Sequence, residues 1–230
     1  TDEGALTELN RVAMAGGRPV HIGIDPSARL AVIPSYHGAT TAVFPLNEDG
    51  SLEPHSALFT HEGASVHPKR QTRAYPHGVD FHPTLDLAAV ADLGSDKLWL
   101  YDVDRANRTL VPRDPPAVVM TPGAGPRHLL FHDNGTWLYV INELDNTMTF
   151  LAVGRDRAVT AQQRISTLPD SFTGNSTTAE LVLHPTGRYL YGSNRGHDSM
   201  VGYQVDPADG RLTRIGWTPI GGQQPRFIGL

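Results

Sequence analysis

The sequence predicts an all-β fold, a β-propeller made of four-stranded antiparallel blades. Short apolar runs are separated by Gly, Pro, Asn and Asp turns, this pattern occurs four times, and its period is near 50 residues. Propeller blades have repeats of this length, whereas helical solenoids have shorter ones. No amphipathic helix of three turns is evident: residues 155–166 come nearest, and they fit an outer strand as well.

The repeat is marked by the turn that joins the first two strands of each blade. Asp25, His82, His132 and His184 take the same place in this turn, so successive repeats are 57, 50 and 52 residues long. Each repeat then continues through a polar corner into a further alternating run, as expected for antiparallel strands. The four complete repeats begin with HIGIDPSARLAVIPSY, HGVDFHPTLDLAAVADL, HLLFHDNGTWLYVINEL and ELVLHPTGRYLYGSNR.

Residues 1–230 are interpreted as one propeller domain that is incomplete at both ends. The segment GALTELNRVAMAGG is typical of the outer strand of a preceding blade, and QPRFIGL of the start of a fifth inner strand. An unpaired inner strand is an open sheet edge, which propellers avoid by closing their ring. We therefore expect the natural protein to be longer on both sides. The alternative is a small ring in which the first strand joins the last.

Composition argues against several classes of function. A net charge of −5, a pI of about 6.1 and the absence of a Lys/Arg run disfavour nucleic acid or a membrane surface as partner. Without cysteine there is no disulfide, thiolate nucleophile or zinc–thiolate site. No apolar run approaches the ~20 residues that cross a bilayer. The chain shows no signal-like segment, so we expect a cytoplasmic location, and nothing in the sequence indicates an oligomeric state.

Alignment of the repeats predicts which side chains meet at one mouth of the central channel. Equivalent positions of successive blades lie on one ring, and the ring at this mouth combines the start of each inner strand with the end of its hairpin partner. The charged or titratable residues on this ring are His77, Arg127, Glu143 and Arg195, with Arg226 from the partial fifth repeat. The same ring contains Val20, Tyr36, Leu93 and Ala179, and one position earlier stand Asp92, Asn142 and Asn194.

These side chains suit an anionic small molecule. Arginine can clamp a carboxylate or phosphate and stabilise a developing oxyanion, and Glu143 or His77 can move a proton. Each residue also has a structural interpretation. Asn142 and Asn194 can cap backbone groups at strand ends, Arg127 and Glu143 can form a cross-strand pair, and Arg195 can lie on the surface.

Other histidines are interpreted as structural. His82, His132 and His184 stand at the turn away from the mouth, where their side chains are expected to bond loop backbone. His55, His61 and His67 are spaced by six residues without a tight ligand pattern, so no metal site is predicted there.

Several segments of the chain resemble the lactonase-type seven-bladed propellers. They are PHGVDFHP, ADLGSDKLWLYDVD, GPRHLLFHDNGTWLYVINELDNTMTF, AELVLHPTGRYLYGSNRGHDS and GGQQPRF, which follow the family's order over about residues 4–230. The family includes the propeller form of 6-phosphogluconolactonase and the fungal 3-carboxy-cis,cis-muconate lactonizing enzyme. The ADLGSDK, GPRH…NEL and SNRGHDS segments are fairly specific, since a generic propeller would not be expected to show all three.

The resemblance implies seven blades, of which this chain would cover roughly blades two to five and the start of six. It also implies an active-site group in the channel mouth, formed by His77 in PH, Arg127 in GPRH, Glu143 in NEL and Arg195 in SNRG. Many members have a second histidine where this chain has Tyr75, and the first repeat reads SYHGATTAV where members are nearer ANYGSGSV. The residues expected to contact substrate are His128, Asn142, Asn194 and Arg226.

The expected activity is hydrolysis of a small anionic sugar lactone, without a metal or organic cofactor. The arginines would hold the substrate's anionic group and the oxyanion, with Glu143 as base or orienter and His77 as proton shuttle. A Glu in contact with Arg127 is expected to stay ionised. The alternatives are a carboxymuconate-type cycloisomerase using the same residues, and a non-catalytic propeller that binds a ligand or a partner.

Overall fold

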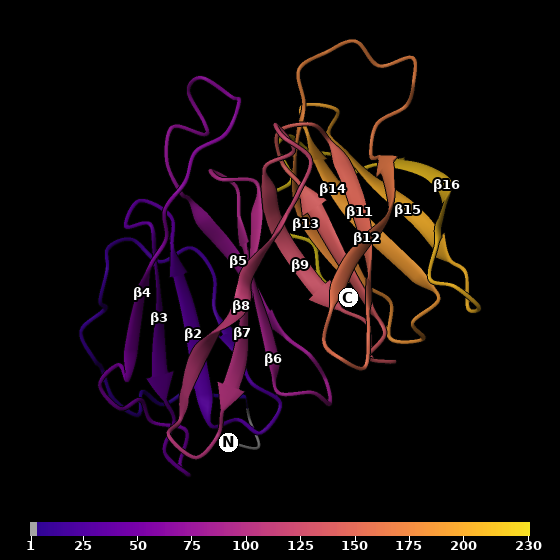
Figure 1. Ribbon diagram of the computed structural model, residues 1–230. Helices are drawn as coiled ribbons and strands as arrows, with labels where there is room; N and C mark the ends of the chain where they lie inside the picture. The colour runs from indigo at the N-terminus through magenta and orange to yellow at the C-terminus, as the bar shows by residue number, and fades with distance from the viewer. Residues whose placement is uncertain (1–3) are drawn as a thin grey trace.

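Four antiparallel sheets of four strands follow one another along the chain in the computed structural model, which describes residues 4–230 (Figure 1). The first two sheets contain β1 Gly23–Ile24, β2 Leu30–Ser35, β3 Thr40–Pro45, β4 Ala57–Thr60, β5 Pro76–Phe81, β6 Leu87–Asp92, β7 Lys97–Asp104 and β8 Thr109–Val119. The last two contain β9 Pro126–Phe131, β10 Trp137–Asn142, β11 Thr147–Val153, β12 Val159–Ser166, β13 Thr177–Leu183, β14 Tyr189–Arg195, β15 Ser199–Val205 and β16 Leu212–Pro219.

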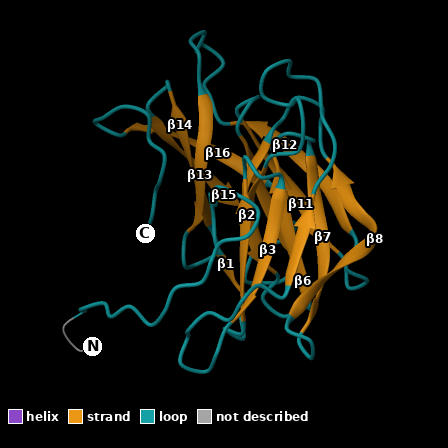
Figure 2. Cartoon of the chain, turned by 90° about the vertical axis from the view of Figure 1, so that its left-hand side faces the viewer, coloured by secondary structure: helices purple, strands orange, loops and turns teal. Residues whose placement is uncertain are grey.

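The sheets are blades of a propeller, as predicted. Within each sheet the strands lie in chain order, and the innermost strands of neighbouring blades pack in the order β1, β5, β9, β13. The regular elements of the described residues are all strands joined by loops (Figure 2), and none of those residues forms a helix that could span a membrane.

Apolar side chains between neighbouring blades form the core. One cluster, which includes Leu30 and Tyr101, lies between the first and second blades, and another, which includes Tyr139 and Tyr203, lies between the third and fourth. The second strand β6, with the sequence LAAVAD, is buried along its whole length, so small residues fit where it is enclosed. The outer strand β12 is mostly exposed and does not alternate between buried and exposed residues, so its sequence lacks the two-residue period of a half-buried strand.

Two of the turn histidines join their blade to the next. Nδ1 of His82 accepts a hydrogen bond from the Leu85 N–H at 2.9 Å, and its Nε2 lies 2.6 Å from the carbonyl oxygen of Gly135 in the next blade. His132 repeats the arrangement one blade further, with Nε2 3.0 Å from the carbonyl oxygen of Gly187. The interpretation of these two histidines as structural is confirmed.

The two end segments differ from the sequence prediction. Residues 4–18 form no strand, although an outer strand was expected there, and Val12 and Met14 pack on the cluster around Phe44. Residues 221–230 likewise form no strand, although an inner strand was expected. A strand needs a hydrogen-bonded neighbour, and within residues 4–230 neither segment pairs with one. Figure 2 shows the N-terminal segment leaving the sheets as an extended loop.

Close packing of β5 against β9 leads to a stability prediction. A Cβ at Gly78 would lie 2.6 Å from the carbonyl oxygen of Arg127 and 2.8 Å from the Cα of His128, both backbone atoms. We therefore expect Gly78→Ala to lower the free energy of unfolding by about 1–3 kcal/mol. Gly216→Ala is the matched control, because a Cβ there meets nothing within 4 Å. Urea denaturation measures both, and equal effects of the two substitutions would contradict the prediction.

Candidate active site

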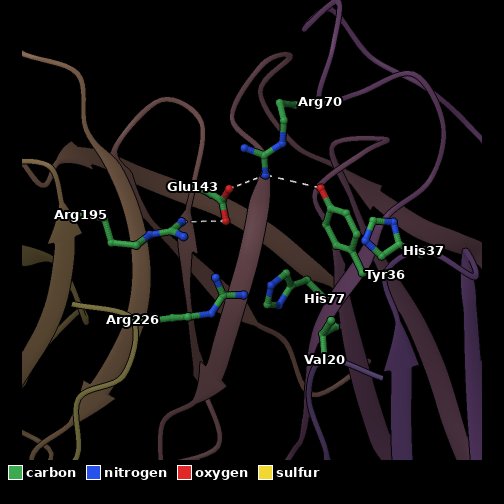
Figure 3. A pocket seen from close by; sticks show the side chains of 8 residues that line it. All are labelled: Val20, Tyr36, His37, Arg70, His77, Glu143, Arg195 and Arg226. Atoms are coloured by element: carbon green, nitrogen blue, oxygen red, sulfur yellow. Dashed lines mark hydrogen bonds and ion pairs between the residues drawn. The ribbon is translucent and has the colours of Figure 1, made fainter. Parts of the chain in front are cut away.

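A cavity of about 280 Å³ opens at one mouth of the channel (Figure 3). His77 enters it from the start of β5, while Glu143 and Arg195 enter from the ends of β10 and β14. The predicted ring thus brings side chains from three blades to one place. The cavity is lined by Val20, Tyr36, His37, Arg70, His77, Glu143, Arg195 and Arg226.

Bulges in the inner strands aim these side chains. In the third blade Ile141 pairs with His128 and Asn142 with Pro126, so Arg127 is an extra residue without a cross-strand partner. The second blade has the same irregularity between Pro76 and Val79, around His77. A bulge locally breaks the alternation of side chains along a strand. It therefore lets Arg127 and His128, which are adjacent in sequence, both face the interior.

Glu143 is held by three guanidinium groups. Its Oε2 lies 2.9 Å from Arg195 Nη2 and 3.0 Å from Arg127 Nε, and its Oε1 lies 2.5 Å from Arg70 Nη2. The contact with Arg127 is an ion pair without hydrogen-bond geometry. Burial opposes ionisation of Glu143, but Arg195, Arg70 and Arg127 outweigh it and lower the pKa of the carboxyl group. Glu143 is therefore a carboxylate at neutral pH.

Arg127 lies behind Glu143 and does not line the cavity. Its side chain is only 3% exposed, and Nη1 donates to the carbonyl oxygen of Ala179 at 2.5 Å. Burial lowers the pKa of Arg127 to about 10, while Glu143 opposes this change, so the guanidinium is still charged at neutral pH. Its role in the structure is to hold Glu143 in a buried position.

His77 is a neutral imidazole at the edge of the cavity. Burial, reinforced by the charge of Arg127 and by His128, lowers the pKa of His77 well below 6.5. Its Nδ1 is buried and makes no hydrogen bond to any residue in the described part of the chain. His77 therefore presents an uncharged ring to a ligand at neutral pH.

The predicted substrate-contacting residues are placed differently from one another. Arg226 lines the cavity and makes no ion pair with the residues that the structure describes. His128 lies deeper, with Nδ1 2.6 Å from Oε1 of Glu180. Asn142 donates to the hydroxyls of two threonines in its own hairpin, and Asn194 to the carbonyl oxygen of Thr167 and the hydroxyl of Ser199. The two asparagines thus stabilise strand ends and do not line the cavity.

Alignment of the repeats did not single out Arg70, Tyr36 or His37 as site residues. Tyr36 is on the predicted ring, but only the acidic, basic and histidine residues of that ring were proposed as site residues. Arg70 belongs to the loop between β4 and β5, which has no counterpart of equal length in the other repeats. No repeat alignment could have placed it, because a loop residue has no equivalent position in another blade.

A cluster of three histidines lies under the cavity. The ring of His128 is 4.9 Å from that of His77 and 4.7 Å from that of His21. Burial and the neighbouring His128 lower the pKa of His21 to about 4. In residues 4–230, no group of three or more His, Asp or Glu side chains is arranged to hold a metal ion.

Comparisons with known proteins agree with this architecture. Residues 1–230 match the family described as "Lactonase, 7-bladed beta-propeller". The chain is 33% identical over 229 residues to 6-phosphogluconolactonase of Bacillus subtilis, covering 98% of this chain and 63% of that protein. It is also 33% identical to an uncharacterized protein of Lactococcus lactis, over 96% of this chain and 63% of the relative.

Among solved structures, the periplasmic gluconolactonase of Pseudomonas aeruginosa superposes with a TM-score of 0.84 at 31% identity, covering 91% of this chain and 59% of the other. The chain thus spans about three fifths of the length of these relatives. The fold and the cavity define a propeller with a charged site at its channel mouth. The chain belongs to the lactonase family of seven-bladed β-propellers, which confirms the resemblance inferred from its motifs.

The histidine cluster predicts a loss of stability in mild acid. Unfolded imidazoles take up protons near pH 6.5, whereas folded His21 does so only near pH 4. Below pH 6.5 the unfolded chain therefore binds more protons, and the free energy of unfolding falls as the pH falls. The expected slope is up to about 1.4 kcal/mol per pH unit for each such group. Urea denaturation of the whole natural protein at pH 7 and pH 5 measures the change.

The substitution His21→Gln removes one of these groups and should weaken the dependence on pH. His184→Gln, in the turn between β13 and β14, replaces a histidine outside the cluster by the same residue and is the control. The other titrating groups are common to all three proteins, so they cancel in the comparison. A wild-type pH dependence in His21→Gln would contradict the prediction.

Proposed function

We propose that the cavity binds a small anionic sugar lactone and hydrolyses it. The observation that carries this proposal is the charge of the lining: Arg70, Arg195 and Arg226 face a single carboxylate, that of Glu143. Two positive charges remain after Glu143 is matched, and Arg226 has no acidic partner in residues 4–230. Such a surplus of guanidinium groups favours an anionic ligand. Membership of the lactonase family and the names of several relatives support the lactone as substrate.

In this proposal His77 is the general base, in place of the shuttle role expected from the sequence. Three guanidiniums occupy both carboxylate oxygens of Glu143, whereas Nδ1 of His77 has no partner among the described residues, so Glu143 is suited to orienting Arg70 and Arg195. His77 is neutral at pH 7 and can accept a proton from water. Its low pKa then makes the resulting imidazolium a good acid.

The reaction would proceed through a tetrahedral intermediate. The water oxygen forms a bond to the lactone carbonyl carbon while its proton moves to His77. Arg226, which lies beside His77 (Figure 3), stabilises the oxyanion that develops on the carbonyl oxygen. The bond from the carbonyl carbon to the ring oxygen then breaks, and the His77 imidazolium protonates the leaving alkoxide. The product is the open-chain acid, and His77 returns to its neutral form.

Lactone hydrolysis by the whole natural protein tests the proposal. We expect acid release from 6-phosphogluconolactone well above the spontaneous rate, with kcat lowered about 10²-fold in His77→Gln and in Arg226→Gln. Arg188→Gln is the matched control, because Arg188 is an exposed arginine at the hairpin turn away from the mouth, and it should retain the wild-type rate. Folded wild type that releases acid only at the background rate would remove the lactonase proposal and leave a binding role.

The pH dependence of kcat/KM separates His77 from a histidine with an ordinary pKa. Since the pKa of His77 lies well below 6.5, the base is still deprotonated at pH 6. We expect kcat/KM at pH 6 to equal its value at pH 7 and to decline only in more acidic buffer. A kcat/KM that halves near pH 6.5 would contradict the assignment of His77 as base.

A further inference from the structure

We propose that Arg70 binds the anionic substituent of the lactone and makes the site prefer charged lactones to neutral ones. This inference rests on the proposed function, and it concerns a part of the cavity built by an inter-blade loop rather than by the blades. Figure 1 shows this loop, residues 61–75, rising above the end of β4 before the chain enters β5. Arg70 is therefore a specificity-determining residue outside the ring of blade residues.

The loop holds Arg70 in place before any ligand arrives. Its neighbour Gln71 is 1% exposed, and the Gln71 side chain donates to the carbonyl oxygen of Leu93 at 2.9 Å while accepting from the N–H of His67 at 3.0 Å. Nδ1 of His67 in turn accepts from the N–H of Arg70 at 3.2 Å. These bonds tie a tight turn to the second blade. Arg70 thus extends from an anchored segment, which lowers the ordering cost of binding.

The guanidinium of Arg70 has unused donors. Its side chain is 38% exposed, and both of its hydrogen bonds, to Glu143 Oε1 and to the hydroxyl of Tyr36, use the same nitrogen, Nη2. The Nε and Nη1 groups make no hydrogen bond to the described residues. Arg70 can therefore keep its ion pair with Glu143 and still donate to a phosphate or carboxylate.

The other arginines are less suited to this role. Arg127 is buried and does not line the cavity, and the side chain of Arg195 is only 13% exposed, with its Nε buried, against 38% for Arg70. Arg226 lies beside His77, where the carbonyl of the lactone would react. Arg70 lies on the opposite side of Glu143, next to Tyr36 (Figure 3). The cavity thus has two cationic ends, and a substrate that uses both carries its anionic group away from the reacting carbonyl.

Tyr36 supports Arg70 from the first blade. Its ring stacks on that of Tyr75 at 4.6 Å between centroids with the planes 18° apart, and its hydroxyl lies 3.4 Å from Arg70 Nη2. The stack fixes the orientation of the Tyr36 ring in the cavity wall, where the ring can contact an apolar face of a sugar ring. The Tyr36 ring also meets the ring of His77 edge to face, with 5.9 Å between the centroids, so Tyr36 lies between Arg70 and the proposed base.

The test compares a charged and a neutral lactone in the whole natural protein. For Arg70→Gln we expect kcat/KM for 6-phosphogluconolactone to fall about 10–100-fold, while that for gluconolactone changes less than about threefold. Lys69→Gln is the control, because Lys69 is an exposed cation in the same loop and does not line the cavity. It should leave both substrates at wild-type values. Arg70→Lys, which keeps the charge but loses the forked donor, should fall between Gln and wild type.

Equal losses for the two lactones in Arg70→Gln and Arg70→Lys would overturn the proposal, since Arg70 would then act only through Glu143. Unchanged values for both would overturn it as well. Calorimetric binding of 6-phosphogluconate and gluconate separates this proposal from the proposed function. If the wild type hydrolyses neither lactone, and Arg70→Gln weakens binding of 6-phosphogluconate but not of gluconate, the lactonase proposal fails and the assignment of Arg70 stands. If the wild type binds the two acids equally, the assignment of Arg70 fails.

Discussion

A carboxylate removed from water must be matched by positive charge, and this requirement organises the mouth of the propeller. Glu143 follows β10 of the third blade, and its three partners come from β9, from the end of β14 and from the loop before β5. One buried ion cluster therefore ties three blades together at the end of the molecule where no histidine turn joins them. Removing the carboxylate would leave Arg127 buried without its acid, which is costlier than the loss of a surface ion pair. The same cluster is thus both a structural tie and the wall of the cavity.

The cluster in turn depends on the bulges of the inner strands. In a regular strand alternate side chains face opposite sides, so Arg127 and His128 could not both face the interior. The extra residue in β9 removes this restriction and lets Arg127 reach Glu143 while His128 reaches Glu180. The bulge in β5 does the same for His77, and Gly78 beside it allows β9 to approach closely. The bulges in successive blades therefore direct side chains of different blades into one cavity.

The sequence predicted most of the fold and part of the site, for physical reasons that differ between residues. Four blades and the meeting of Arg127, Glu143 and Arg195 followed from the repeat, because equivalent positions in blades must lie on a ring. The bulges could not be predicted from the sequence, because apolar and charged residues both occur on the buried side of these strands and no residue pattern marks the extra position. Arg70 was missed because it belongs to a loop without an equivalent in other blades. The terminal strands were expected from their residue pattern and did not form, because a strand requires a hydrogen-bonded neighbour as well as a suitable sequence.

The charge surplus that favours an anionic ligand also sets the protonation state of the group beside it. Burial lowers the pKa of His77, and the charges of Arg127 beneath the cavity and of Arg226 in its lining lower it further, so the imidazole is neutral at pH 7. In the proposed reaction, a substrate whose anionic group is bound by Arg70 would offset part of this effect and raise the proton affinity of His77 when a proton is taken from water. In the proposed reaction, proton transfer would thereby depend on whether the cavity is occupied. A neutral ligand would provide no such change, so under the proposed function a charged substrate would be favoured in the chemical step as well as in binding.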